Sequence, residues 1–212
     1  MFYRFCRCLI RFFFIVFCHW KVEGVDNIPQ EGPVLVIANH FSYWDPVVVA
    51  CALERPVHFM AKKELFSYII LGPLIRKLGA FPVDRNRVDR ASLRNALSLL
   101  DEGKIVCIFP EGTRGRTGTL LPPLPGAAFL ARKAGVPVCP VALLKKRRFW
   151  GNIVFPRYYV KVGSTFSIEE AGKRDRQDSA NFMMAKIQEI IDFLLQTSRN
   201  LYLPAEKAIR KG

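Results

Sequence analysis

Short runs of apolar residues alternate along the chain with longer segments in which apolar residues recur at helical spacing. The runs are rich in β-branched side chains, and they lie at residues 34–38, 57–61, 105–109, 138–143 and 158–162. Continuous apolar strands separated by helices are typical of a sheet that is buried on both faces. The pattern therefore predicts an α/β fold: a single domain with a mostly parallel central sheet flanked by helices.

Three segments between and after these runs have the helical period. The clearest one ends at Gly103, because glycine commonly terminates helices. Its apolar side consists of Leu93, Ala96, Leu97 and Leu100. A second helix is predicted at residues 67–78. A third, at residues 182–195, is predicted to cover the sheet.

The first twenty residues combine many aromatic side chains with Arg4, Arg7 and Arg11. Their longest apolar run, residues 12–18, has seven residues, whereas a helix that crosses a bilayer needs about 20. The arginines have i, i+3, i+7 spacing, which predicts one face that meets lipid phosphates, beside aromatic residues at the acyl boundary. We therefore predict an N-terminal amphipathic membrane-interface segment at residues 1–22 and one domain at residues 23–212.

Two other interpretations of this first segment stay open. A signal peptide also combines basic and apolar residues, but Trp20 and Lys21 stand where a small-residue cleavage site is expected. A plain buried helix is the second alternative. A buried helix requires most aromatic side chains of the segment to be buried, whereas a membrane-interface helix requires them to be exposed.

The formal net charge is +14, from 32 Lys and Arg against 18 Asp and Glu. This charge predicts attraction to polyanions such as nucleic acid, anionic lipid, phosphorylated substrates or an acidic carrier protein. The six cysteines match neither a zinc-ligand pattern nor a disulfide framework, so we expect reduced thiols and a cytosolic setting. A hydrophobic content of 50% excludes a disordered chain.

The run at 34–38 leads directly into a segment that contains His40, Asp45 and Pro46. Ligands of open α/β sheets bind at the carboxyl ends of the strands. Asp45 followed by Pro46 predicts a helix N-cap, and the tight loop before it can bring the carboxylate to the imidazole. A hydroxyl that attacks a thioester must lose its proton, and imidazole is the usual base near pH 7. His40 and Asp45 are the candidate catalytic dyad; a structural histidine beside a capping aspartate is the alternative.

A second polar segment, with Glu111, Gly112, Thr113 and Arg114, follows the run at 105–109. It also lies at the carboxyl end of a strand, so we expect it on the same rim. Glycine lets the backbone approach an anion, and the planar guanidinium of Arg114 matches a phosphate. Glu111 is expected to accept a hydrogen bond from a substrate hydroxyl or to hold Arg114. The alternative is an exposed turn with a salt bridge.

Arg85 adds another guanidinium between these two segments. It either binds the same phosphate or forms a surface ion pair with Asp84 or Asp89, which is the more common fate of such an arginine. A shared anion site requires that the imidazole of His40 and the guanidinium of Arg114 lie in one pocket.

Two further features offer alternative roles. Cys107 allows a covalent acyl-enzyme, but it lies inside an apolar run, where a cysteine usually acts as an inert small hydrophobic residue. The basic run at residues 145–148 predicts either a solvated turn or a contact with lipid headgroups or an acidic carrier protein.

Taken together, these segments resemble the glycerolipid acyltransferase family, in particular its 1-acyl-glycerol-3-phosphate acyltransferases of the bacterial PlsC type. The similarity covers most of the chain as blocks in a fixed order, at residues 24–29, 39–45, 61–66, 109–114 and 136–141. The resemblance implies that His40 is a general base supported by Asp45. It also implies that Arg85 and residues 111–114 hold the phosphate of the acceptor.

The same resemblance implies acyl transfer from acyl-CoA or acyl-carrier protein to lysophosphatidic acid, giving phosphatidic acid for phospholipid biosynthesis. No metal or prosthetic group is expected. Enzymes of the family work at the cytosolic face of the cell membrane, so a peripheral or monotopic protein is expected. Relatives often carry a lysine before the helix near Gly126, where this chain has Leu124. This departure leaves open the strength of phosphate binding and the identity of the acceptor.

Two rival functions stay open. Within the enzyme class, the acceptor is glycerol-3-phosphate itself or another lyso-lipid. In another class, the chain is a basic module that binds anionic membranes or nucleic acid without catalysis. Nucleic-acid binding usually needs aromatic residues interleaved on a sheet or a reading helix. The sequence shows neither, so no nucleic-acid partner is expected.

Overall fold

A seven-stranded sheet with the strand order β1-β7-β6-β2-β5-β3-β4 forms the centre of the protein. The computed structural model describes residues 1–18, 20–85, 89–115, 120–150, 153–171, 177–190 and 192–193. The strands are β1 (Lys21–Glu23), β2 (Val34–Ala38), β3 (Val57–Lys62), β4 (Phe81–Val83), β5 (Ile105–Ile108), β6 (Val138–Trp150) and β7 (Ile153–Val162). All described strand pairs are parallel except β6 with β7. The predicted α/β fold with a mostly parallel sheet is therefore confirmed.

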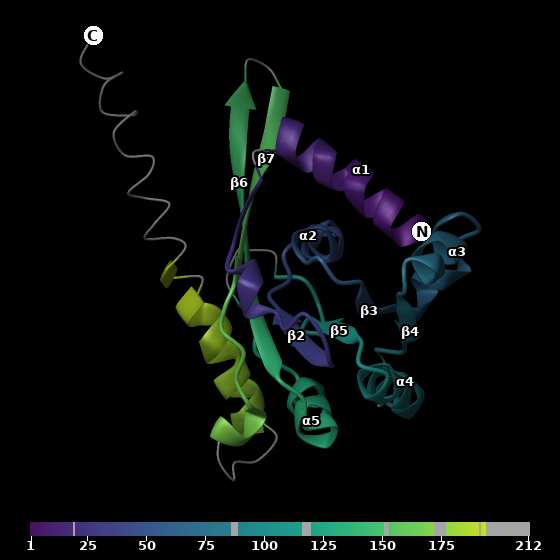
Figure 1. Cartoon of the computed structure of the whole chain (residues 1–212), viewed down its shortest axis with the longest axis vertical. Helices are drawn as coiled ribbons and strands as arrows, with labels where there is room; N and C mark the ends of the chain where they lie inside the picture. The colour runs from purple at the N-terminus through teal and green to yellow at the C-terminus, as the bar shows by residue number, and fades with distance from the viewer. Residues whose placement is uncertain are drawn as a thin grey trace.

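Helices cover both faces of this sheet (Figure 1). The helices are α1 (Phe2–Phe17), α2 (Asp45–Ala52), α3 (Leu71–Lys77), α4 (Arg90–Asp101) and α5 (Pro125–Ala134), with 3₁₀ turns at Val25–Asn27, Lys63–Ser67 and Ile168–Ala171. Residues 177–190 and 192–193 are also helical. One face packs on α1 and α2, and the other packs on α4, α5 and the helix at 177–190.

The central strand β2 shows why its sequence is apolar throughout. Val34, Val36 and Ala38 belong to the core on the α2 face, whereas Leu35 and Ile37 belong to the core on the α5 face. All five residues are fully buried, because successive side chains point to opposite faces of a sheet that is covered on both sides. Burial of this kind stabilises the fold by about 1.5–3 kcal/mol for each large aliphatic side chain.

Several predicted boundaries differ from the structure. The helix predicted at residues 67–78 is shorter, because a 3₁₀ turn occupies Lys63–Ser67 and α3 begins at Leu71. The turn predicted at residues 145–148 is wrong, since β6 continues through them and pairs with β7. The helix predicted at 182–195 begins earlier, and Ile191, Leu194 and Leu195 lie outside the described residues.

Helix α4 ends as the sequence predicts. Gly103 has a φ of 74°, a left-handed conformation that glycine adopts without steric cost. Its N–H donates to the Leu100 carbonyl at 2.8 Å, and the Lys104 N–H donates to the Leu99 carbonyl at 3.0 Å. At the other end, Asp89 caps the helix by accepting from the Ala91 and Ser92 N–H groups, both at 3.0 Å.

Helix α1 contacts α2 from the side away from the sheet (Figure 1). Most of its apolar side chains are exposed. Phe14 is its buried residue, so the helix is not the plain buried helix of the second alternative. One detail of the membrane prediction is wrong. The Arg7 guanidinium donates to the Leu53 carbonyl at 3.0 Å and also to the Glu54 carbonyl, so it faces the protein instead of lipid. Within the described residues, no helix has both the length and the apolar character needed to cross a bilayer.

Candidate active site

Two loops meet where β2 and β5 end. We call residues 39–45 the histidine loop and residues 109–115 the arginine loop. Their strands are parallel neighbours, with Val34 opposite Ile105, so both loops leave the same edge of the sheet. The Gly115 N–H donates to the His40 carbonyl at 2.9 Å. The structure therefore brings the two predicted segments together on one rim.

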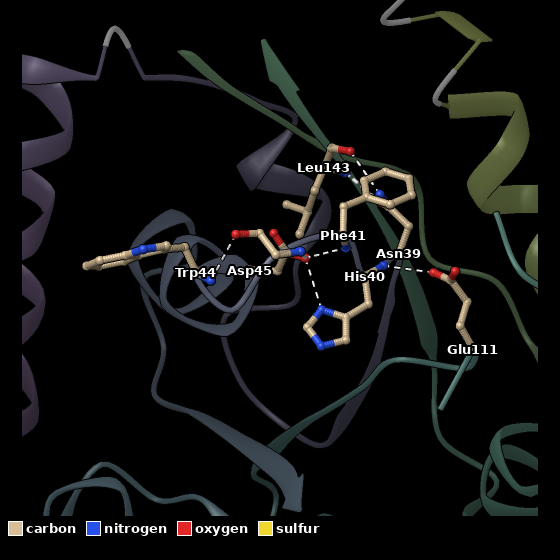
Figure 2. Close-up of polar contacts among 8 residues, drawn as sticks. Asn39, His40, Phe41, Trp44, Asp45, Glu111 and Leu143 are labelled. Atoms are coloured by element: carbon tan, nitrogen blue, oxygen red, sulfur yellow. Dashed lines mark hydrogen bonds and ion pairs between the residues drawn. The ribbon is translucent and has the colours of Figure 1, made fainter. Parts of the chain in front are cut away.

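The histidine loop is organised by one carboxylate oxygen. Oδ2 of Asp45 lies 2.9 Å from Nδ1 of His40 and accepts the N–H groups of Phe41 and Ser42 at 2.6 Å each. Both His40 and Asp45 are buried. Figure 2 shows that the ring meets Asp45 through this one nitrogen, whereas its second nitrogen points away from the carboxylate. The arrangement fixes the ring orientation and leaves Nε2 for a substrate.

The position of Asp45 differs in one respect from the prediction. Helix α2 begins at Asp45, and Trp44 occupies the capping position, so Asp45 is not the N-cap. Pro46 follows within the first turn, where its missing N–H is not needed. Because the carboxylate turns back into the loop, it serves His40 instead of the helix.

Aromatic and backbone contacts fix the histidine further. The imidazole stacks on Phe109 with a centroid distance of 4.2 Å and an angle of 21° between the rings. Phe59 stacks on the far side of this contact, 6.4 Å from Phe109. The buried Asn39 side chain donates to the Leu143 carbonyl at 2.9 Å and accepts the Leu143 N–H at 2.7 Å. The Asn39 side chain thereby joins the histidine loop to the backbone of β6 through one donated and one accepted hydrogen bond (Figure 2).

Sequence reasoning missed these two supporting residues. Asn39 carries a weak signal, because an amide directly after a buried strand needs partners for both its donor and its acceptor. Phe109 carries none, since an aromatic residue at the end of an apolar run looks like ordinary core.

Glu111 links the two loops. Its Oε1 accepts the His40 backbone N–H at 2.8 Å, and its Oε2 accepts the Leu121 N–H at 2.9 Å. The residue is buried, and this burial raises the pKa of its carboxyl, although the two N–H groups act in the opposite direction. Because both oxygens already have backbone partners, Glu111 supports the loops, a role that differs from the expected contact with substrate or Arg114.

The candidate phosphate residues lie beside the histidine loop. The Arg114 guanidinium lies over the Tyr43 ring, 3.5 Å from its centroid, and Thr113 is exposed next to it. The pKa of Arg85 is lowered, first by partial burial and then by the positive charge of Arg114. Two guanidinium groups whose like charges repel each other favour the binding of an anion that neutralises them.

The expected alternative partners of Arg85 have other interactions. The Asp84 carboxylate forms a salt bridge with Lys63 at 2.8 Å. The Asp89 carboxylate caps α4 and also accepts the Asp84 N–H at 2.9 Å. Both carboxylates are therefore parts of the framework around the rim.

Leu124 contacts the arginine loop directly. Gly112 has a φ of 66°, and a Cβ atom there would lie 2.3 Å from Cδ1 of Leu124. The Leu124 N–H donates to the Pro110 carbonyl at 2.8 Å. Leu124 is 55% exposed, so it lies at the surface beside Gly112.

Cys107 does not reach this rim as a reactive thiol. It is fully buried in β5, and burial raises the pKa of the thiol well above its ordinary value. A groove of about 550 Å³ lies elsewhere, between α4 and α5, and none of the predicted site residues is among its described lining residues.

Comparison with known proteins identifies the family. The sequence model of the acyltransferase family matches residues 19–144, a span that includes both loops and Arg85. The chain belongs to the acyltransferase family. This acyltransferase is 33% identical to a 1-acyl-sn-glycerol-3-phosphate acyltransferase of Bacillus subtilis over 141 residues, which are 66% of this chain and 70% of the relative.

Two other relatives agree with this assignment. A 1-acyl-sn-glycerol-3-phosphate acyltransferase of Streptococcus pneumoniae is 31% identical over 82% of this acyltransferase and 66% of the relative. The crystal structure of the 1-acyl-sn-glycerophosphate acyltransferase PlsC from Thermotoga maritima superposes with a TM-score of 0.71 at 25% identity, over 91% of this chain and 80% of that one. The resemblance drawn from the sequence, and the assignment as an acyltransferase enzyme, are confirmed.

Proposed function

We propose that this acyltransferase moves a fatty acyl group from a thioester to the sn-2 hydroxyl of 1-acyl-sn-glycerol-3-phosphate, giving phosphatidic acid. The observation that carries the proposal is the buried contact of 2.9 Å between His40 and Asp45, beside the Arg114 guanidinium on the Tyr43 ring. The names of the relatives from Bacillus subtilis and Thermotoga maritima support this choice of acceptor.

His40 acts as the general base in this proposal. Asp45 holds the Nδ1 side of the ring, so Nε2 takes the proton of the acceptor hydroxyl while the hydroxyl oxygen attacks the thioester carbonyl carbon. The tetrahedral intermediate then collapses, the carbon–sulfur bond breaks, and the leaving thiolate takes the proton from the imidazolium. The negative charge of Asp45 stabilises that imidazolium. A base of this kind contributes about 100- to 10,000-fold in rate.

Arg114 and Arg85 bind the phosphate of the acceptor, with the backbone at Gly112 and the exposed Thr113 beside them. The support for this step is electrostatic: partial burial and then the Arg114 charge lower the pKa of Arg85, and a bound dianion offsets the repulsion between the two groups. Holding the phosphate places the neighbouring hydroxyl near His40, which turns an encounter of two molecules into a positioned reaction.

The location that we propose is the cytosolic face of the cell membrane, where the protein is peripheral or monotopic. Helix α1 supports this proposal because Phe5 and Phe12 are 66% and 63% exposed, and the net charge of +14 favours anionic lipid. The donor is acyl-CoA or acyl-carrier protein, and the proposed chemistry uses no metal or prosthetic group.

An acyl-transfer assay with purified protein tests the proposal. The acceptors are 1-acyl-sn-glycerol-3-phosphate, glycerol-3-phosphate and lysophosphatidylcholine, and each is offered acyl-CoA and acyl-carrier protein in turn. We expect phosphatidic acid from the first acceptor with at least one donor. Transfer to glycerol-3-phosphate alone, or to lysophosphatidylcholine alone, contradicts the proposed acceptor. An absence of transfer with every pair, together with RNA binding that survives added vesicles, supports the non-catalytic alternative.

A further inference from the structure

A second apolar element projects from the surface near α1. Residues 68–70 connect the 3₁₀ turn at Lys63–Ser67 to helix α3, and we call them the isoleucine turn. Ile69 is 91% exposed and Ile70 is 83% exposed, and Tyr68 between them and the 3₁₀ turn is 61% exposed. We propose that the isoleucine turn inserts into an anionic lipid bilayer as a second membrane contact of this enzyme, separate from α1.

The isoleucine turn has a fixed shape that keeps these side chains outside the core. The Gly72 N–H donates to the Tyr68 carbonyl at 2.9 Å. A Cβ atom on Gly72 would lie 2.4 Å from the Phe66 carbonyl oxygen, so the chain closes tightly on itself at this point. The Arg76 guanidinium lies 4.8 Å from the centre of the Phe66 ring and packs on it. Because the backbone of Phe66 packs against Gly72 on the inner side of the turn, Ile69 and Ile70 lie on its outer side and are exposed.

Helix α3, which follows the turn, lies near the amino-terminal end of α1. Figure 1 shows α3 beside the amino-terminal end of α1, and Nζ of Lys77 lies 5.9 Å from the centre of the Phe2 ring. The same end of α1 carries Phe5 and Leu9, which are 66% and 61% exposed. Apolar side chains from two elements that are far apart in sequence thus share one flank of the protein.

Positive charge surrounds this apolar flank. Arg76 and Lys77 occupy the last turn of α3, and Arg4 is exposed on α1. Basic residues around a small apolar tip match the interface of an anionic bilayer, where the apolar tip enters the acyl boundary and the cations meet phosphates. This charge complementarity selects a lipid surface over a second copy of the chain, which carries the same net charge of +14.

The isoleucine turn is linked to the candidate phosphate site through the 3₁₀ turn that precedes it. The 3₁₀ turn before it contains Lys63, whose Nζ pairs with Asp84 at 2.8 Å, directly beside Arg85. Contact at both α1 and the isoleucine turn fixes the tilt of the domain, which a single helix leaves free to rotate. The inference rests on the proposed membrane location, and it adds the segment that orients the candidate phosphate site toward the lipid.

Vesicle binding tests this second contact. The double variant Ile69→Ser, Ile70→Ser and the wild-type chain are sedimented with vesicles of phosphatidylcholine and phosphatidylglycerol in a 7:3 ratio. We expect the variant to bind about 10- to 100-fold more weakly, because two aliphatic side chains no longer leave water. The matched control is Phe193→Ser, which removes an apolar side chain that is 48% exposed after the helix on the other face of the sheet. It should bind as the wild type does.

A second measurement distinguishes a lost membrane contact from misfolding of the double serine variant. Ile70→Trp adds an indole to the three tryptophans of the chain, and its additional fluorescence should be quenched by vesicles that contain brominated acyl chains. The inference is overturned if the double serine variant binds vesicles as tightly as the wild type, or if Ile70→Trp shows no added quenching. It is also overturned if the double serine variant loses self-association but still binds vesicles. Failure of the wild type to transfer acyl groups refutes the proposed function but leaves the vesicle result standing.

Discussion

The histidine loop and the arginine loop leave neighbouring strands at one edge of the sheet, yet they are held in different ways. Asp45 organises the histidine loop from within, since its Oδ2 accepts from the imidazole and from two N–H groups of the same loop. The arginine loop is held from outside, because Gly115 and Glu111 both bond to the backbone of His40. The ring of the candidate base is therefore oriented by a carboxylate of its own loop, whereas the arginine loop is bonded to the backbone of the histidine loop.

The largest effect is expected from removal of the base itself. His40→Ala should lower the rate of acyl transfer by about 100- to 10,000-fold while the arginine loop still binds acceptor, because no other group takes the hydroxyl proton. Initial rates with 1-acyl-sn-glycerol-3-phosphate measure this, and circular dichroism checks the fold. His58→Ala is the control, since the His58 ring lies 3.0 Å from the Gly79 carbonyl, away from the dyad. Equal losses in both variants contradict the assignment.

Asp45→Asn tests whether charge or shape matters in the histidine loop. An amide oxygen in the place of Oδ2 can accept the same three N–H groups, so the loop keeps its form. It carries no charge to stabilise the imidazolium, and we expect a loss of about 100- to 1,000-fold in kcat with little change in KM. Steady-state kinetics of the folded variant provide the measurement. An unchanged kcat would reduce Asp45 to a structural role.

Arg114→Ala removes the guanidinium group of the arginine loop and leaves His40 unchanged. We expect kcat/KM for the acceptor to fall about 10- to 100-fold, mainly through KM, because the guanidinium meets the phosphate in the ground state as well as in the transition state. Arg114→Lys keeps the charge but lacks the planar fork, so its loss should be smaller. A rise in KM for the thioester donor, with the acceptor KM unchanged, would assign Arg114 to the donor instead.

Glu111→Gln breaks the link between the loops. In contrast to Asp45, each oxygen of Glu111 has its own N–H partner, so an amide must turn its NH₂ group against one of them. We expect a loss of about tenfold in activity and about 1–3 kcal/mol in stability. Thermal unfolding and the transfer assay measure the two effects.

The pH dependence of stability sharpens this prediction. Burial raises the pKa of the Glu111 carboxyl in the folded protein, so the native state holds this proton more tightly than the unfolded chain does. The stabilisation of the folded protein by the protonated Glu111 carboxyl is complete below the unfolded pKa of about 4.3. It is lost as the pH rises through the pKa of the folded state. The stability difference between wild type and Glu111→Gln should therefore shrink as the pH rises above about 4. A difference that grows over this range contradicts the assigned direction of the shift.

The smallest effect is expected at Leu124, which rests on Gly112. Leu124→Lys brings an ammonium group to the arginine loop, and an exposed cation adds only a modest attraction to a phosphate. We expect the acceptor KM to fall about two- to fivefold, with a stronger dependence on salt. Leu124→Met is the control for shape. An equal fall in KM with methionine would show that charge is not the cause.

The sequence predicted the parts of the fold that follow from local patterning. The apolar run at 34–38 matches β2 in full, because a strand buried on both faces needs no polar residue. Strands β1 and β4 were not predicted, since each has three residues and β4 contains Pro82. The extension of β6 beyond Leu143 was also missed, because it follows from pairing with β7 and not from a local apolar run.

The site divides in the same way. The contact between His40 and Asp45 joins residues five positions apart, so the short loop that follows an apolar strand indicated it. The bond from the His40 N–H to Glu111 spans 71 positions, and the contact of Asn39 with Leu143 spans 104. No local pattern carries such pairs, which explains why Glu111 was expected to face the substrate and why Asn39 was overlooked.

The enclosure of the imidazole has a consequence for side reactions. The His40 side chain is 9% exposed, and its contacts with Asp45 and Phe109 are complete before any substrate arrives. A base that deprotonates an alcohol also deprotonates water, so a thioester held beside it is open to hydrolysis. Close packing around the ring leaves little space for solvent at this base. In the proposed mechanism, the burial of this histidine favours ester formation over the release of free fatty acid.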